Sequence, residues 1–125
     1  MTRILLDTHV FLWWRLGGRE LSPAAIEAIR SAEVVYVSVA SAWEVAIKQS
    51  LGRLRLDADF EEGIADSEFT ALPIQFNHLR ELMRLPPLHR DPFDRLLVAQ
   101  AQSERLVLVT RDPLVLAYGV VAVVA

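Results

Sequence analysis

Short, mostly apolar runs alternate along this chain with longer segments in which apolar residues recur every three or four positions. The short runs predict five β-strands, at residues 3–6, 34–37, 70–72, 106–109 and 120–124. The longer segments predict helices at residues 10–16, 22–32, 41–51, 56–68, 75–84 and 91–104, with a last short helix opened by Asp112-Pro113. Strands that alternate with helices and are too apolar for a water-facing side form parallel sheets covered on both faces. The pattern therefore predicts a three-layer α/β/α fold around a central parallel five-stranded sheet.

Sequence signals mark where several of these helices begin. Ser22-Pro23 is typical of an N-cap followed by proline in the first helical position, and Asp91-Pro92 and Asp112-Pro113 have the same form. Ser41-Ala42-Trp43-Glu44 matches a capping box at a helix start. The segment 56–68 holds six acidic residues and is expected to be a solvated helix.

Composition narrows the class of protein. With 125 residues the chain is expected to be one domain, residues 1–125. Its 53% hydrophobic content suits a sheet buried on both faces, or a surface that meets a partner. The net charge of −3 argues against a basic coat for nucleic acid, so any nucleic acid must be held locally. Cysteine is absent, which excludes disulfides, zinc–thiolate sites and thiol nucleophiles.

The start of the chain carries no recognisable targeting signal. It reaches an acidic residue, Asp7, too early for a signal peptide. No run approaches the ~18 apolar residues that a membrane span needs. We therefore expect a soluble, cytoplasmic protein with no membrane partner.

Four acidic residues fall at related places in this plan. Asp7 ends the first strand, Glu44 lies in the first turn of the helix after the second strand, and Asp112 follows the fourth strand. Strand C-termini and the helix N-termini that follow them share one edge of a parallel sheet, which is where open α/β sheets bind ligands. Asp94 lies in the first turn of the helix that precedes the fourth strand, and the simplest topology would put it at the opposite end.

The residues alone leave two interpretations of these acids open. Acids at helix N-termini cap free N–H groups and complement the helix dipole, and most of these residues stand at such positions. Capping does not explain why the first strand ends in Asp7 with no competing base nearby. Convergent carboxylates, without cysteine or a paired histidine motif, are typical of sites for Mg²⁺ or Mn²⁺. Such ions activate water in phosphodiester hydrolysis.

Five segments of the chain resemble the PIN-domain family. They are Leu5-Leu6-Asp7-Thr8-His9, residues 38–48 (SVASAWEVAIK), Leu51-Gly52-Arg53-Leu54, residues 89–101 (HRDPFDRLLVAQA) and residues 108–113 (LVTRDP). They stand in the family's order over essentially the whole chain, and the WE-x-x-x-K and RDPFDR wording is closest to the VapC-like toxins. The resemblance implies an endoribonuclease that hydrolyses RNA phosphodiester bonds, as the toxin of a type II toxin–antitoxin pair.

The resemblance also implies a metal site. The family binds Mg²⁺ or Mn²⁺ through four catalytic acids, and it brings the helix before the fourth strand to the acidic pocket. Asp91 is the alternative to Asp94 as the third of these acids, and we assign it to helix capping. Many relatives carry a further acid two or three residues beyond the fourth, but Pro113-Leu114-Val115 has none, which leaves a second metal ion open. The four acids correspond here to Asp7, Glu44, Asp94 and Asp112.

Other residues near the acids are expected to support them or to contact RNA. By resemblance, Thr110 and Thr8 would support the site through hydroxyl hydrogen bonds. Lys48, one turn after Glu44, either pairs with that carboxylate or touches phosphate. His9 and a second histidine, His89, lack metal-ligand spacing, so surface or supporting roles are favoured. The arginines expected to contact phosphate are Arg53, Arg90, Arg95 and Arg111.

Three kinds of partner follow, with two alternative functions. The substrate is expected to be RNA and the inhibitor an antitoxin protein, and the aromatic residues at 11, 13 and 14 suggest a homodimer face or an antitoxin groove.

One alternative function is that of a PIN-type nuclease of RNA processing or repair without a toxin role. The other is a receiver-like signalling domain, which expects adjacent acids after the first strand and a late lysine. Here Asp7 stands between Leu6 and Thr8, and no lysine follows Lys48.

Overall fold

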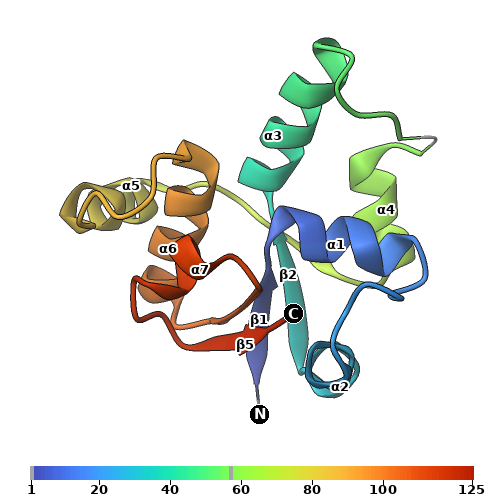
Figure 1. The fold of residues 1–125 in the computed structure, drawn as a ribbon, viewed down its shortest axis with the longest axis horizontal. Coiled ribbons are helices and arrows are strands. Elements are labelled where there is room, and N and C mark those ends of the chain that lie inside the picture. Colours follow the sequence, from blue (N-terminus) through green and yellow to red (C-terminus); the bar gives the residue numbers. More distant parts are fainter. Residues whose placement is uncertain (1, 57) are drawn as a thin grey trace.

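A computed structural model describes residues 2–56 and 58–125. Along the chain, strands alternate with helices and every strand is followed, directly or after a loop, by a helix or the C-terminus (Figure 1). The elements are β1 Arg3–Leu6, α1 Thr8–Arg15, α2 Pro23–Ser31, β2 Val34–Ser38, α3 Val39–Ser50, α4 Phe60–Asp66, β3 Thr70–Leu72, α5 Phe76–Arg84, α6 Pro92–Glu104, β4 Val107–Thr110, α7 Pro113–Leu116 and β5 Ala122–Val124.

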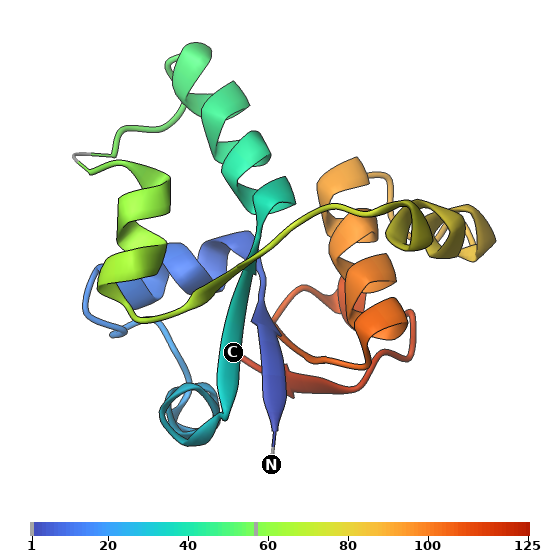
Figure 2. The same cartoon turned by 180° about the vertical axis from the view of Figure 1, so that it is seen from behind.

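The five strands form one parallel sheet in the order β3-β2-β1-β4-β5. β1 lies at its centre, where Ile4 is in register with Val35 of β2 on one side and with Val107 of β4 on the other. This confirms the predicted α/β fold with a five-stranded parallel sheet. Because all strands point the same way, their C-terminal ends meet at one edge, and α1 and α3 start there (Figures 1 and 2).

Two cores cover the two faces of the sheet. Along β1 the side chains alternate between them: Ile4 and Leu6 pack with α1, α2 and α4, while Leu5 packs with α6 and α7. All three are fully buried, which explains why the strands carry no polar alternation. Figure 2 shows the two groups of helices on opposite sides of β1 and β2.

Two helix starts differ from the prediction. α1 begins at Thr8 rather than at residue 10, because the Asp7 carboxylate accepts a hydrogen bond from Val10 N and caps the helix. α3 begins at Val39, because the Ser38 hydroxyl, not that of Ser41, is the N-cap and accepts from a backbone N–H. The predicted capping box was therefore wrong.

The acidic helix is shorter and less solvated than predicted. α4 spans Phe60–Asp66, because Asp59 caps it, and Asp57 of the predicted 56–68 helix lies outside the described residues. One side of α4 is buried through Gly63 and Ile64, so only its other side faces water. The remaining boundaries agree with the prediction to within two residues. Among residues 2–56 and 58–125, no helix is both long and apolar enough to cross a membrane.

Candidate active site

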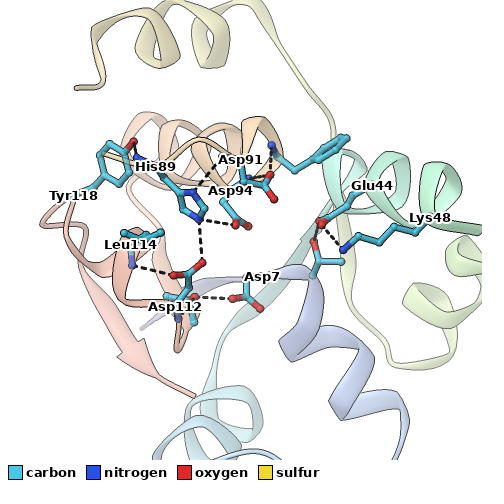
Figure 3. A network of polar contacts seen from close by, with 12 residues as sticks. Asp7, Glu44, Lys48, His89, Asp91, Asp94, Asp112, Leu114 and Tyr118 are labelled. Atoms are coloured by element: carbon cyan, nitrogen blue, oxygen red, sulfur yellow. Dashed lines mark hydrogen bonds and ion pairs between the residues drawn. The ribbon is translucent and has the colours of Figure 1, made fainter. Parts of the chain in front are cut away.

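A pocket of about 300 Å³ opens at the C-terminal edge of the sheet. Acidic residues from four separate segments dominate its wall, and Figure 3 shows their carboxylates pointing toward one another. The three acids expected at this edge and Asp94 all line it. The lining residues are Asp7, His9, Trp13, Glu44, Lys48, Asp91, Asp94, Arg111 and Asp112.

Asp7 stands where β1 ends and α1 begins. Its Oδ1 accepts from Val10 N at 2.8 Å, and its Oδ2 accepts from the Thr110 hydroxyl at 2.6 Å. Thr110 is fully buried at the end of β4, so the hydroxyl fixes the carboxylate between two neighbouring strands. Burial raises the pKa of Asp7 above its ordinary value of 3.8, and the nearby Asp112 adds to this rise. Asp7 is thus both a helix cap and a partly buried acid.

Glu44 lies in the second turn of α3, not in the first turn as predicted, because the helix begins at Val39. Only 5% of its surface is exposed. Its Oε1 accepts from the Thr8 hydroxyl at 2.7 Å, and its Oε2 lies 2.9 Å from Lys48 Nζ. Ser41, predicted as a cap, is instead buried with its Oγ 2.8 Å from the Thr8 hydroxyl. Both oxygens of Glu44 therefore have a fixed partner.

Asp94 reaches the same pocket from the first turn of α6, which corrects the topological expectation. A helix that leads into a parallel strand runs back across the sheet, so its N-terminus lies at the edge where the strands end. With 13 residues, α6 is about 20 Å long, enough to cross the whole sheet. Asp91 is its N-cap, and Asp91 Oδ1 accepts from the N–H groups of Phe93 and Asp94 at 2.8 and 3.2 Å.

The charge around Asp94 is not balanced by neighbouring bases. Burial raises its pKa from 3.8 to about 7, and repulsion from Asp91 and Glu44 adds to the rise. Asp112 completes the group as the N-cap of α7, with its Oδ1 2.9 Å from Leu114 N and its N–H bonded to the Thr110 hydroxyl. Thr110 thereby contacts both Asp7 and Asp112.

His89 lies against two of the acids, where it can have the supporting role that was one of the two roles expected for it. Its Nε2 lies 3.0 Å from Asp94 Oδ2 and 3.0 Å from Asp112 Oδ2 (Figure 3). One ligand atom from each of these three residues falls within 4.8 Å of the others. No spacing rule could find this group, because Asp112 is 23 positions away in sequence. His9, by contrast, stays at the pocket rim with its ring 5.7 Å from that of Trp13.

The four arginines divide into two pairs. Arg95 donates to Leu85 O, and Arg111 donates to Glu20 O and Ala125 O with its guanidinium 4.2 Å above the Trp13 ring. Both are therefore held by the fold. The other two, Arg53 and Arg90, are exposed and line an adjoining pocket of about 350 Å³. Glu44, Lys48 and Asp91 line both pockets.

The donor set fits a hard divalent cation. Carboxylate oxygens are the ligands that Mg²⁺ and Mn²⁺ prefer, and the hydrogen bonds described above hold these carboxylates in place without a metal. Burial, with repulsion between the acids as a further cause, raises the pKa values of Asp7 and Asp94, so their ionised forms are poorly stabilised here. A cation in this pocket would stabilise those ionised forms.

Comparison with known proteins identifies the family. The PIN domain model matches residues 4–118. Ribonuclease VapC22 of Mycobacterium tuberculosis is 31% identical over an alignment 123 positions long, which covers 90% of this chain and 88% of that protein. Among solved structures, a toxin–antitoxin complex from Klebsiella pneumoniae aligns with a TM-score of 0.66 at 21% identity, covering 96% of this chain and 95% of that one. PAE2754 from Pyrobaculum aerophilum aligns with a TM-score of 0.65 at 21% identity, covering 98% and 89%. This chain belongs to the PIN-domain family.

Proposed function

We propose that this protein is a Mg²⁺- or Mn²⁺-dependent endoribonuclease and the toxin of a type II toxin–antitoxin pair. One observation carries the proposal: carboxylates from β1, α3, α6 and α7 converge in a single pocket at the ligand-binding edge of the sheet. The name of the relative, ribonuclease VapC22, supports RNA as the substrate. The proposed ligands and catalytic groups are Asp7, Glu44, Asp94 and Asp112.

The chain's own residues prepare this pocket for a phosphodiester. When bound, a divalent ion supplies an acidified water and neutralises charge on the phosphate. Thr110 and Thr8 hold Asp7 and Glu44 so that their remaining lone pairs face the pocket. Lys48 fixes the outer oxygen of Glu44, which leaves that carboxylate placed to orient the attacking water. The attacking water gives up a proton as its oxygen bonds to phosphorus, the bond to the leaving ribose oxygen breaks, and that oxygen takes up a proton.

The adjoining pocket is our candidate path for the RNA strand. Lys48, Arg53 and Arg90 supply positive charge there, and Phe93 offers an aromatic ring. Cationic side chains bind phosphate, and a base can stack on an aromatic ring. The net charge of −3 argues against a general attraction to RNA, so a local group of positive charges is needed to bind the strand. Because the fold already holds Arg95 and Arg111, we assign the phosphate contacts first to Arg53 and Arg90.

The inhibitory partner in this proposal is a small antitoxin protein. The toxin–antitoxin complex from Klebsiella pneumoniae and the VapBC complex from Salmonella typhimurium share this fold. An arginine from such a partner would find unbalanced carboxylates in the pocket, where the pKa of Asp94 is raised to about 7. We expect the antitoxin to be encoded by a small gene beside the gene of this protein. Adding that gene's product should abolish cleavage. Full cleavage in a stable complex of the two proteins would contradict this part.

We also propose a homodimer, although not through the aromatic residues of α1 that the sequence suggested. Phe11 is buried in the core, and Trp13 and Trp14 pack against it. Apolar side chains exposed on α3 and α5 support the dimer instead.

Phe76 and Met83 of α5 are 79% and 85% exposed, and Trp43 of α3 is 54% exposed. Large exposed apolar side chains on neighbouring helices are typical of protein interfaces. Trp43 packs edge-on against Phe93 of the adjoining pocket, with 4.8 Å between the ring centroids, so the proposed interface reaches the margin of that pocket.

Cleavage of a mixed tRNA and rRNA pool tests the proposed activity. Purified protein is incubated with Mg²⁺, with Mn²⁺ or with chelator, and the fragment ends are analysed. We expect cutting with either metal, none with chelator, and no 2′,3′-cyclic phosphate, because water rather than the ribose 2′-hydroxyl attacks. Cutting in chelator, or cyclic phosphate ends, would contradict a metal-dependent hydrolase.

A further inference from the structure

Asp94 is held less firmly than the other three acids. Asp7 has a backbone and a hydroxyl partner, Glu44 has Thr8 and Lys48, and Asp112 caps α7. In the part of the chain that the structure describes, the only polar contact of the Asp94 carboxylate is with His89, at 3.0 Å.

The position of the proton on His89 follows from its other nitrogen. The backbone N–H of Asp91 points at His89 Nδ1 over 3.1 Å. A backbone N–H can only donate, so Nδ1 is the acceptor and carries no proton. A neutral ring then has its proton on Nε2, the atom that faces Asp94 and Asp112.

The ring has little freedom to leave this position. Its side chain is 11% exposed, and the backbone N–H of His89 donates to the Tyr118 hydroxyl at 3.0 Å. A ring nitrogen binds a metal through its lone pair, and Nε2 has none to offer while it carries the proton. For Nε2 to become a ligand, the proton would have to move to Nδ1 and face the N–H of Asp91.

We propose that His89 is a positioning residue: its Nε2–H, bonded to Asp112 Oδ2 and 3.0 Å from Asp94 Oδ2, keeps the two carboxylates side by side at the pocket, and His89 is not itself a metal ligand. This rests on the proposed metal site. The spacing of the three side chains alone would allow His89 to be either a metal ligand or a positioning residue, and the position of the proton distinguishes these two roles. Histidines that act on metals through a carboxylate in this way change affinity without entering the coordination shell.

The first test measures Mn²⁺ affinity by calorimetry in the full-length protein. Loss of a group that orients a ligand costs about 10–100-fold in metal affinity, and we expect His89→Ala to weaken Mn²⁺ binding by that factor. His89→Gln keeps an N–H donor near the place of Nε2 and should recover part of the loss. His9→Gln is the matched control, because it removes an imidazole at the same pocket that makes no hydrogen bond to the acids, and it should change affinity little.

The second test asks directly whether nitrogen coordinates the metal. With ¹⁵N-labelled histidine, the NMR signal that disappears in His89→Ala should show a protonated Nε2 and a bare Nδ1, both before and after Mg²⁺ is added. Pulsed electron paramagnetic resonance of bound Mn²⁺ should show no coupling to a histidine nitrogen. A proton that moves to Nδ1 on Mg²⁺ addition, or a nitrogen coupling that His89→Ala abolishes, would overturn the proposal.

These outcomes separate this proposal from the proposed function. Wild-type affinity in a folded His89→Ala variant, with metal-dependent RNA cleavage intact, would overturn the positioning role alone. A wild-type protein that binds no Mn²⁺ would overturn the metal site and the positioning role together.

Discussion

The acids of the pocket lie close together and are partly withdrawn from water, and the pKa values of two of them are raised. The pKa of Asp7 is raised chiefly by burial, and that of Asp94 rises to about 7 through burial and repulsion by Asp91 and Glu44. A carboxyl group with a raised pKa in the folded state binds its proton more tightly there than in the unfolded chain. Folding therefore opposes its ionisation, and the metal-free site is strained by its own charge.

This strain predicts a pH dependence of stability without metal. The stability that protonated Asp94 contributes is complete below its ordinary pKa of 3.8 and is lost as the pH rises through about 7. In chelator, the melting temperature should therefore fall between about pH 4 and pH 7 and level off above pH 7. Asp94→Asn should flatten this fall. Parallel melting curves of the variant and the wild type across that range would contradict the assignment.

Thr110 allows a second test at the same scale. Its buried hydroxyl donates to Asp7 and accepts from Asp112 N, so Thr110→Val leaves a partly buried carboxylate oxygen without its donor. The free energy of unfolding should drop by about 1–3 kcal/mol, and Mn²⁺ affinity about tenfold or more. Urea unfolding and calorimetry measure the two effects. A variant with lower stability but unchanged affinity would limit Thr110 to a structural role.

The sequence predicted some of these residues and could not predict others. Asp7, Glu44 and Asp112 follow from strand order, because Asp7 and Asp112 stand just after the ends of parallel strands and Glu44 lies in the helix that directly follows one. His89 meets Asp112 only because the loop before α6 folds back against the start of α7, and its backbone is tied there to Tyr118. Contacts of that kind depend on loop geometry, which has no periodic signature.

At the scale of elements, a buried polar network joins the helix that carries Asp94 to the sheet. Gln100 of α6 is fully buried, with its Oε1 2.6 Å from the Ser38 hydroxyl at the end of β2. Its Nε2 lies 3.3 Å from Pro73 O and 3.3 Å from His78 Nδ1 in α5. The network connects β2, α5 and α6, and thereby fixes where the N-terminus of α6 meets the pocket.

Gln100→Leu tests this network. Leucine fills much of the same volume but leaves the Ser38 hydroxyl without its acceptor, so the free energy of unfolding should fall by about 1–3 kcal/mol. Gln102→Leu, two residues on in the same helix and only partly buried, should stay within about 0.5 kcal/mol of wild type. Equal urea midpoints for Gln100→Leu and wild type would show that the network contributes no stability.

Element boundaries were predictable where only one capping residue was present. Ser22 and Asp91 begin their helices as expected, because a proline follows each and fixes the first turn. Before α3, two serines compete, and the strand extends to Ser38, so the first serine caps while Ser41 turns inward to Thr8. Sequence spacing could not separate these two serines, since both precede helical residues.

At the scale of the whole molecule, the apolar residues of the chain lie both in the core and on the surface. The sheet takes one part, because its strands are buried on both faces, and this made the fold class readable from the sequence. The order β3-β2-β1-β4-β5 was not readable, because it depends on which side of β1 each crossover returns. Another part stays exposed at several places on the surface, and we assign the side chains on α3 and α5 to the homodimer.

The dimer makes a prediction about Met83, the most exposed of these side chains at 85%. Met83→Glu places a charge in the proposed interface and should raise the dimer dissociation constant at least about tenfold, or 1.4 kcal/mol. Leu16→Glu, an apolar residue 80% exposed at the end of α1, is the matched control and should leave assembly unchanged. Sedimentation equilibrium measures both, and equal constants for Met83→Glu and wild type would exclude α5 from the interface.

The most direct test of the account is the cleavage rate of end-labelled RNA against Mn²⁺ concentration, for wild type and Asp7→Asn. The matched control is Asp66→Asn. Asp66 is an exposed acid on α4 that does not line the pocket, and in the described ion pairs it contacts only Arg15. We predict a rate that rises with Mn²⁺ in wild type and Asp66→Asn and stays at background in folded Asp7→Asn. Cleavage by Asp7→Asn at the wild-type rate, or wild-type cleavage that ignores Mn²⁺, would contradict a metal-dependent nuclease built on these acids.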